Sequence, residues 1–347
     1  MVRIGTLPLR LVALDNGANL VWGPEIVDKA IIGTQRVVDP HSGTIRYIKN
    51  QRQIWETHPL EKNKIIFQLG SSNLNLAVEA AKWVQQDVAG IGLNCGCPKH
   101  FSIQAGMGAA LLSEPDKLCS ILEALVTNLT VPVDVKIRLF DDKEKTLNLV
   151  ERLIKTGISA LTVHCRTKEM RSSEPALIDR LKDIVDLVKQ QSNNTIPVIA
   201  NGDCFMVKQD QQRIQQLTGV NSVMIARGAE MNPTCFNEST GYKDPIEHVI
   251  PQLIKISIKT NNPFGNTKYV LNSIDLTKSP TTRSKQERSK FKILINQSKN
   301  FKDLLLACQL DSEKVFKQIE NQDLSSLVPD WMERRRRIVD DDKVEHV

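Results

Sequence analysis

The chain of 347 residues lacks the features of several common protein classes. No apolar run reaches the roughly 18–20 residues of a membrane span, and the N-terminus lacks the basic and then apolar pattern of a signal peptide. No second pair of closely spaced cysteines accompanies Cys95 and Cys97, although a zinc site needs about four ligands. RNP motifs and zinc knuckles are also missing. We therefore expect no membrane segment, no metal site and neither of these RNA-binding modules.

The overall composition is that of a soluble globular protein, with 41% hydrophobic and 25% charged residues. Its seven cysteines are scattered and odd in number, which favours a reducing compartment over a disulfide-stapled scaffold. The net charge of +6 is mild, so the placement of the basic residues matters more than their number. We expect a monomeric protein of the cytoplasm, and also of the nucleus if a basic run near the C-terminus acts as a localisation signal.

Seven apolar, β-branched segments alternate with amphipathic helical patterns along the first two thirds of the chain. Because each segment is apolar almost throughout, each is predicted to be a strand buried on both faces, as in a parallel sheet. The predicted strands are residues 19–25, 64–70, 90–96, 132–139, 160–166, 197–203 and 222–228. The predicted helices are residues 6–14, 71–86, 113–129, 147–157, 175–191 and 209–219.

This alternation is compatible with a (β/α)8 TIM barrel or with a doubly wound sheet. No GxGxxG follows the first strand, as a dinucleotide-binding sheet would require. Polar side chains end nearly every strand, which is typical of the active-site rim of a barrel. They are Glu25, Gln68, Asn94, Lys136, Arg138, His164, Asn201, Asp203 and Arg227. We therefore predict an α/β TIM barrel over residues 1–240, lacking its first strand because the helical pattern at 6–14 has no strand before it, and a small all-helical domain over residues 241–347.

Two glycine-containing tripeptides, NGD at 201–203 and ARG at 226–228, end the last two predicted strands. In TIM barrels the loops after these strands often bind a phosphate through backbone N–H groups. Glycine lets the backbone approach a phosphate closely, and Arg227 adds positive charge. Each tripeptide alone would also suit a plain turn, but their joint placement favours a phosphate site.

Lys136 lies two residues before Arg138, so both side chains point to one face of the predicted strand. A lysine facing a barrel lumen must be paired or functional, because an unpaired buried charge is costly. It could form a Schiff base, supply a fixed positive charge to an electron-rich cofactor ring, or pair with a neighbouring carboxylate. The residues alone leave these three roles open.

The decapeptide LNCGCPKHFS at 93–102 holds two cysteines around one glycine. A redox disulfide usually has two intervening residues, and a Cys-Gly-Cys bridge would be strained. Cys95 ends a buried strand and is predicted to be structural, whereas Cys97 lies in a bend beyond the strand, beside Lys99. A lone thiol there can donate a proton or act as a nucleophile. Since no Cys/His/Asn arrangement of a thiol hydrolase is present, although His100 is close in sequence, we favour proton donation.

Together these residues resemble the tRNA-dihydrouridine synthases, which are flavin-dependent barrel enzymes. NCGCPKHFSIQAGMGAALL at 94–112 is similar to the active-site strand and loop of that family. Shorter motifs follow in family order over about residues 1–235, namely QLGS, DVKIRL, HCRT, NGD and MIARG. The CPKHFS and GMGAALL forms, with NTKYVL at 266–271, are most similar to the eukaryotic members that act on position 20 of tRNA.

The resemblance implies a chemistry in which NADPH, or NADH, reduces FMN and the flavin delivers hydride to C6 of a uracil while Cys97 protonates C5. The FMN-binding residues that it implies are Met1, Glu25, Gln68, Lys136, His164, Asn201, Gly202, Asp203, Ala226 and Arg227. It implies that Met1 stands where the family's first strand ends in Ala-Pro-Met, and that Asn94 holds the substrate uracil. Lys99 and Arg166 are expected to contact the RNA substrate at the barrel rim.

The C-terminal third carries a basic run between Lys278 and Lys302, with eight basic residues and one acidic residue. Such a run is usually a solvated helix face, but beside a base-modifying barrel it favours contact with the phosphate backbone of tRNA. The predicted contacts are Arg283, Lys285, Arg288 and Lys290. A second run at 334–337, followed by three aspartates, is either a solvated tail or a nuclear-localisation signal.

Three rival functions remain open on the sequence. The first is another FMN-dependent barrel reductase of dihydroorotate or enoate type, against which the basic C-terminal run argues. The second is an aldolase that uses Lys136, which would leave Cys97 without a role. The third is a non-catalytic RNA-binding barrel that lost FMN together with the missing strand.

Overall fold

The structure is a computed structural model that describes residues 1–334, so the predicted basic and acidic residues at 335–342 lie outside the described residues. The chain divides into two compact units, which are described one at a time. The sheet unit comprises residues 22–37 and 45–226, and the helical unit comprises residues 1–21, 38–44 and those from 227 onward.

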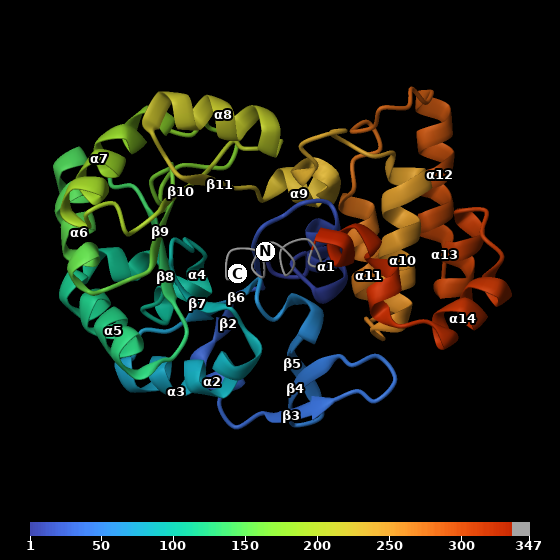
Figure 1. The fold of residues 1–347 in the computed structure, drawn as a ribbon, viewed down its shortest axis with the longest axis horizontal. Helices are drawn as coiled ribbons and strands as arrows, with labels where there is room; N and C mark the ends of the chain where they lie inside the picture. The colour runs from blue at the N-terminus through green and yellow to red at the C-terminus, as the bar shows by residue number, and fades with distance from the viewer. Residues whose placement is uncertain (335–347) are drawn as a thin grey trace, which may run out of the picture. The chain divides into compact units, whose positions relative to one another are not determined.

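A curved sheet forms the centre of the sheet unit (Figure 1). All seven predicted strands are present, and they neighbour one another in sequence order. They are β1 (Val21–Trp22), β6 (Ile65–Gly70), β7 (Gly90–Cys95), β8 (Val133–Arg138), β9 (Ala160–His164), β10 (Val198–Asn201) and β11 (Ser222–Met224). The pairs from β6 to β11 are parallel, and the short β2 (Ile26–Val27) adds a parallel pair with β6. The predicted parallel α/β architecture is thus confirmed, and within residues 1–334 no strand precedes the first helix.

Helices cover the outer side of this sheet (Figure 1). They are α3 (Leu74–Val84), α5 (Pro115–Asn128), α6 (Lys143–Lys155), α7 (Leu181–Gln191) and α8 (Val207–Thr218), with the short α2 (Asp28–Ile31). The short α4 (His100–Gln104) belongs instead to the loop that follows β7. Each long helix buries one apolar stripe, as α7 does with Leu181, Ile184, Val185 and Val188. Because the helices occupy the outside, the opposite face of each strand is left for the lumen.

A second, three-stranded sheet was not predicted from the sequence. It consists of β3 (Gln35–Val38), β4 (Ile45–Lys49) and β5 (Arg52–Thr57), with β4 and β5 antiparallel. The ring of Trp55 meets that of Phe67 edge-on, with 5.0 Å between centroids. The hydroxyl of Tyr47 donates to Asp87 at 2.6 Å. These contacts attach the added sheet to the segments around β6 and α3.

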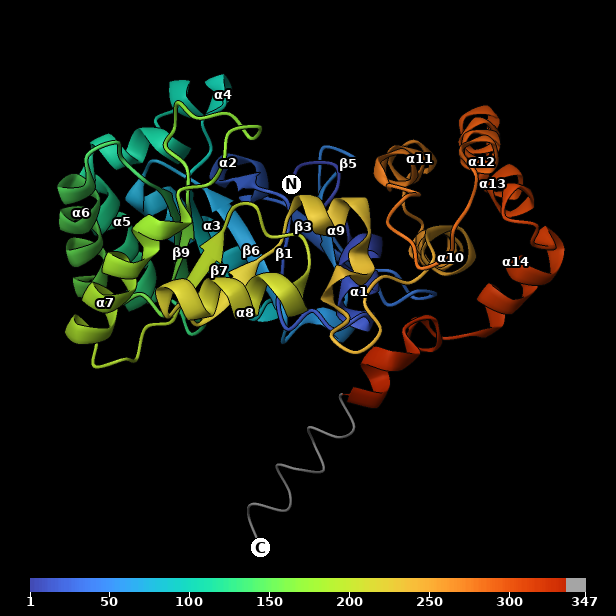
Figure 2. The same cartoon turned by 90° about the horizontal axis from the view of Figure 1, so that it is seen from above.

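The helical unit confirms the predicted helical C-terminal region and also includes the first helix of the chain. Its helices are α1 (Leu7–Asp15), α9 (Arg227–Met231), α10 (Ile250–Lys259), α11 (Phe264–Ser273), α12 (Lys285–Gln297), α13 (Phe301–Ala307) and α14 (Ser312–Asn321). Figure 2 shows α10 to α14 grouped together. Every residue of α1 is buried, and the Asp15 carboxylate accepts from the Trp331 N–H at 2.9 Å and from Gln252 Nε2 at 2.8 Å. Residues more than 200 positions apart in the chain therefore share one core.

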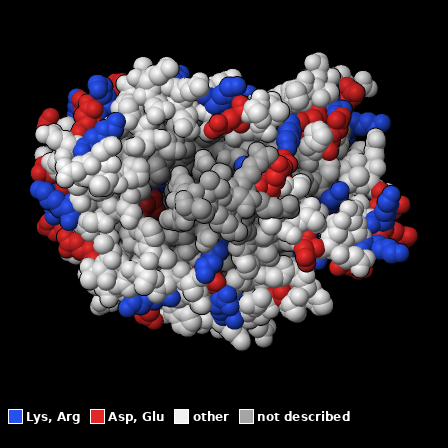
Figure 3. All heavy atoms as spheres, in the orientation of Figure 1, with Lys and Arg blue, Asp and Glu red and all other residues white. Residues whose placement is uncertain are grey.

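Charges of both signs are mixed on the face of the molecule drawn in Figure 3, where Lys and Arg are interspersed with Asp and Glu. Among residues 1–334 no helix combines the length and the apolar character that a membrane span needs. In the same part of the chain, no three His, Cys, Asp or Glu side chains are grouped so that they could hold a metal ion.

Candidate active site

Polar side chains on one face of β8 line the lumen of the sheet unit. Asp134, Lys136 and Arg138 alternate with Val135 and Ile137, which are fully buried on the other face. The register sets Lys136 opposite Asn94 of β7 and Arg138 opposite His164 of β9. Because the strands are parallel, these side chains all lie toward the carboxyl end of the sheet, as the sequence predicted.

Lys136 is a half-buried cation and Asp134 is a buried carboxyl, and neither side chain has a hydrogen-bonded partner among the described residues. Within residues 1–334 the Lys136 ammonium makes no hydrogen bond or ion pair, and neither oxygen of the Asp134 carboxylate has a hydrogen-bond partner. Burial, followed by the charge of Arg138, lowers the pKa of Lys136 to about 8. Burial raises the pKa of Asp134 to about 7, against the smaller opposing effects of Trp22 and Lys136. The lumen thus holds a cation that is free to meet an electron-rich group.

The backbone around Cys97 is fixed by three hydrogen bonds. The Gly96 N–H donates to Asn94 Oδ1 at 3.0 Å, and Arg138 Nε donates to the Gly96 carbonyl at 2.7 Å. The Ala109 N–H donates to the Cys97 carbonyl at 3.0 Å. Cys97 itself is half-buried. The bend beyond β7 is therefore held in place while its thiol stays accessible.

The two cysteines of the decapeptide differ in their surroundings. Cys95 is fully buried, and burial raises its thiol pKa well above the usual range. A thiol in that setting is inert, whereas a half-buried thiol such as that of Cys97 can meet a substrate. The burial of the two side chains supports the predicted division into a structural Cys95 and a working Cys97.

Gly108 packs directly against Cys97. Its φ is +59°, and a Cβ built on it would lie 2.6 Å from the Cys97 carbonyl oxygen and 3.0 Å from the Cys97 Cβ. It would also collide with the hydroxyl of Ser102. No side chain fits here, so the second glycine of the GMG motif lets this loop support the cysteine.

Glu25 and Gln68 lie on the neighbouring strand ends. Glu25 Oε1 is buried without a partner in the described chain and would lie 2.9 Å from a Cβ built on Gly70. Burial raises the pKa of Glu25, while the side chains of Asn94 and Cys97 oppose the rise. Gln68 Nε2 donates to the Gly23 carbonyl at 3.0 Å, which leaves its amide oxygen to receive a hydrogen bond from a ligand.

His164 is held neutral beside Arg166. Arg166 Nη1 lies 3.4 Å from His164 Nε2, so this nitrogen accepts and the proton resides on Nδ1. Burial and the cations Lys136, Arg138 and Arg166 lower the pKa of His164 to about 2. At neutral pH the ring is therefore an uncharged hydrogen-bonding group.

Arg166 occupies the interior rather than an exposed rim, which differs from the expectation that it meets RNA there. Its side chain is 2% exposed, Nη2 pairs with Asp203 Oδ1 at 2.5 Å, and Nε donates to the Glu174 carbonyl at 2.8 Å. A guanidinium engaged in this way supports the loops around His164. The sequence could not reveal this because a strand end followed by a loop does not say which side chain turns inward.

The NGD turn lies next to His164. Gly202 has a φ of +122°, and a Cβ there would lie 3.0 Å from Ala176 Cβ and 3.5 Å from His164 Cδ2. Asp203 has a φ of +50°, and its carboxylate accepts from the Ala176 N–H at 2.6 Å. Asn201 Nδ2 donates to the Met224 carbonyl at 2.9 Å, which ties β10 to β11. Glycine at 202 keeps the backbone of this turn open to a ligand.

The remaining predicted residues are distributed over both units. Lys99 is exposed before α4, and Ala226 closes the sheet unit. Met1, which is 38% exposed, and Arg227, the first residue of α9, belong to the helical unit. The role of these last two residues at the cofactor stays a prediction.

The predicted RNA contacts on α12 and just before it are not equally available. Arg283 is half-buried and pairs with Asp244 at 3.3 Å and Glu247 at 2.5 Å. The Arg288 guanidinium donates to the Arg283 carbonyl. Lys285 and Lys290 are exposed. Among the four, these two lysines are the ones whose charges face solvent.

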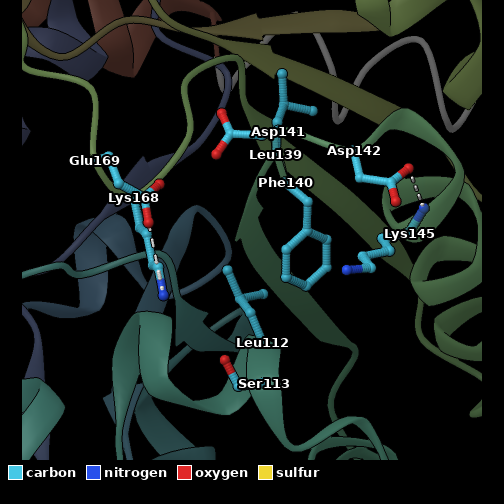
Figure 4. Close-up of a pocket in the computed structure, with 9 residues that line it drawn as sticks. All are labelled: Leu112, Ser113, Leu139, Phe140, Asp141, Asp142, Lys145, Lys168 and Glu169. Atoms are coloured by element: carbon cyan, nitrogen blue, oxygen red, sulfur yellow. Dashed lines mark hydrogen bonds and ion pairs between the residues drawn. The ribbon is translucent and has the colours of Figure 1, made fainter.

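A separate cavity of about 240 Å³ lies among the loops that follow β7, β8 and β9. The ring of Phe140 lies on its wall, with Lys145 and Lys168 to either side (Figure 4). Asp141, Asp142 and Glu169 also line it, so lysines and carboxylates are mixed. None of the predicted site residues lines this cavity.

Comparison with known proteins places the sequence among named enzymes. Residues 21–327 match the dihydrouridine synthase (Dus) family. A tRNA-dihydrouridine(20) synthase [NAD(P)+] of Schizosaccharomyces pombe is 43% identical over 98% of this chain and 68% of its own length. The protein of the same name from Saccharomyces cerevisiae is 43% identical over 79% of this chain and 75% of its own. A tRNA-dihydrouridine(20a/20b) synthase of Saccharomyces cerevisiae is 32% identical over 68% of this chain and 60% of its own.

Proposed function

The chain belongs to the dihydrouridine synthase family, and from this premise we propose that it reduces the C5–C6 double bond of the uridine at position 20 of tRNA. The proposed reductant is NADPH or NADH, and the proposed cofactor is FMN. The choice of position rests on the greater identity to the proteins named for position 20, 43%, than to one named for positions 20a and 20b, 32%.

The observation that carries this proposal is the fixed, accessible Cys97 at the carboxyl edge of a sheet whose lumen holds Lys136 and His164. Hydride arrival at C6 of a uracil places negative charge on C5 and O4, so an acid must be held near C5. A cysteine thiol is an acid of suitable strength to supply that proton. Cys97 is the half-buried thiol of this edge, whereas Cys95 is sealed beneath it.

The residues of the lumen suit a flavin, which would supply the hydride when bound. Lys136 offers an unpartnered cation for the electron-rich pyrimidine edge of the ring, and Gln68 offers its amide oxygen to a ring N–H. The open backbone at Gly202 and the neutral His164 suit the ribityl phosphate side. Arg166 and Asp203 pair with each other, so their role is to hold the turn that offers those groups.

The substrate side of the proposal involves groups of different availability. Asn94 Oδ1 is occupied by the Gly96 N–H, so Nδ2 of this side chain, which also acts on the Glu25 carboxyl, is the donor that would meet a uracil oxygen. Lys99 is exposed next to the cysteine bend and would contact a phosphate of the RNA. Lys285 and Lys290 would add backbone contacts from the helical unit, which help to offset the few kcal/mol needed to unstack a base.

The proposal is tested with purified protein loaded with FMN, NADPH or NADH, and a tRNA made without modifications. After digestion, mass spectrometry should find one uridine that has gained two hydrogen atoms. Free orotate and a small enoate serve as alternative substrates in parallel. Oxidation of NAD(P)H by either small molecule, with no change in the tRNA, would contradict the proposal.

A further inference from the structure

Arg138 is a buried cation without an acidic partner. Its side chain is buried, and within residues 1–334 it makes no ion pair with a carboxylate. Burial and the nearby charge of Arg166 lower its pKa. Burying an uncompensated guanidinium is costly unless its donors are satisfied, so the groups that it contacts explain its presence.

Those groups are two backbone carbonyls on different loops. Arg138 Nε donates to the Gly96 carbonyl, and Nη1 donates to the Thr167 carbonyl, each at 2.7 Å. Gly96 directly precedes Cys97 in the loop after β7, and Thr167 lies in the loop after β9. One side chain of β8 therefore joins the loops of both neighbouring strands.

Arg138 holds the Gly96 carbonyl, whereas other residues hold the neighbouring backbone groups of the Cys97 bend. The Gly96 N–H is bound by Asn94, and the Cys97 carbonyl is bound by the N–H of Ala109. Without Arg138, the peptide between Gly96 and Cys97 would be held only by the hydrogen bonds of the Gly96 N–H and of the Cys97 carbonyl on either side of it. Rotation of this peptide moves the Cys97 side chain directly.

We propose that Arg138 is a positioning residue that sets the place of the Cys97 thiol by holding the Gly96 carbonyl, and that its two donors at a fixed angle are required. A lysine retains the charge but presents a single flexible ammonium, so it cannot bond both carbonyls in the same geometry. The consequence for turnover rests on the proposed function of Cys97. The consequence for the loop does not.

The variant is Arg138→Lys, and the matched control is Arg180→Lys. Arg180 is also partly buried and donates from Nη1 to a backbone carbonyl, that of Phe140 at 2.8 Å, just beyond the end of β8. Both changes remove a guanidinium–carbonyl bond from the same part of the fold. Only the first touches the cysteine bend.

The first readout is the rate at which iodoacetamide alkylates Cys97, followed by peptide mass spectrometry, with added glutathione as an internal reference thiol. A hydrogen bond from a charged donor contributes about 1.5–3 kcal/mol, so its loss should raise the open population and the labelling rate about 10- to 150-fold. Arg180→Lys should leave Cys97 labelling unchanged, and the glutathione reference should react equally in all samples. This readout needs neither tRNA nor NADPH and holds even if the proposed function fails.

The second readout is dihydrouridine formation. Arg138→Lys should lower kcat about 10²-fold, because a misplacement of about 1 Å has that effect, while KM for tRNA and the rate of NADPH oxidation stay unchanged. In Arg138→Ala, added ethylguanidinium should restore part of kcat, which general loss of structure would not allow. Wild-type labelling and kcat in Arg138→Lys would overturn the proposal. A rise in KM alone would overturn it in favour of direct contact with the substrate.

Discussion

Replacement of Gly108 by alanine should displace the catalytic thiol through backbone contact alone. Gly108 combines a left-handed φ of +59° with a Cβ position only 2.6 Å from the Cys97 carbonyl oxygen and 3.0 Å from the Cys97 Cβ. Neither neighbour is the end of a flexible side chain. Relief of the clash therefore has to move either the glycine loop or the Cys97 bend.

The expected loss of stability in Gly108→Ala has two parts. A left-handed conformation costs a residue with a Cβ about 1–2 kcal/mol. Overpacking against atoms that cannot rotate away adds about 1–3 kcal/mol. The free energy of unfolding should therefore fall by about 2–5 kcal/mol, and kcat should fall about 10²-fold through displacement of the thiol.

Gly33→Ala provides the matched control. Gly33 has a φ of +75°, but a Cβ built there meets nothing within 4 Å, so the variant should show the conformational cost alone. Urea unfolding of both variants measures the stability difference, and dihydrouridine formation measures kcat. Equal stability and equal kcat in the two variants would refute the argument that Gly108 supports Cys97.

Three further changes should have distinct effects. Asp134→Asn should remove a pH dependence of stability. The pKa of Asp134 is raised from 3.8 to about 7 in the folded protein, so the wild-type protein should lose up to about 4 kcal/mol of stability as pH rises through this range. Urea unfolding at pH 5 and at pH 8 measures this loss. Gly202→Ala should lower the FMN content of the purified protein, because its Cβ would lie 3.0 Å from Ala176 Cβ at a φ of +122°. Replacing both Lys285 and Lys290 with glutamine should make the slope of log K for tRNA binding against log salt concentration shallower. The slope should fall by up to about 0.9 for each phosphate that the protein no longer neutralises.

The controls for these three changes are drawn from the same structure. Gly219→Ala alters a glycine of φ +73° at the end of α8 and should leave FMN content unchanged. Glutamine at the exposed Lys155 and Lys182 should leave the salt slope unaltered. An Asp134→Asn protein with the pH profile of the wild type would show that this carboxyl ionises freely in the fold. An unaltered slope for the Lys285 and Lys290 variant would identify α12 as a solvated helix face.

The sheet strands and outer helices could be predicted because each carries its signal locally. Most strands of the parallel sheet read as one apolar run, as the fully buried β7 does from Gly90 to Cys95, whereas β11 is half-buried. The hairpin of β4 and β5 was not predicted because its turn lacks the glycine that usually marks such a turn in a sequence. Asn50 and Gln51 both have a positive φ, as a type I′ turn requires, but glycine is the common second residue.

Side-chain burial at the site was harder to predict than strand position. Strand alternation set Lys136 and Arg138 on one face, but it could not show that Arg138 holds the Gly96 carbonyl across the neighbouring strand. In the same way Arg166 follows a strand end in sequence, yet it turns inward to Asp203. The packing of α1 with the C-terminal helices depends on contacts such as Asp15 with Trp331, which no local pattern encodes.

The central claim is that Cys97 completes the reduction of a tRNA uridine. The most direct measurement is the rate at which tRNA reoxidises the prereduced protein under anaerobic conditions, followed through the flavin absorbance at about 450 nm. NADPH should reduce the wild-type protein, Cys97→Ala and Cys95→Ala alike. On addition of tRNA, the wild-type protein and Cys95→Ala should reoxidise and form dihydrouridine, whereas Cys97→Ala should do so about 10²–10⁴-fold more slowly. Reoxidation of Cys97→Ala at the wild-type rate would contradict the assignment of Cys97.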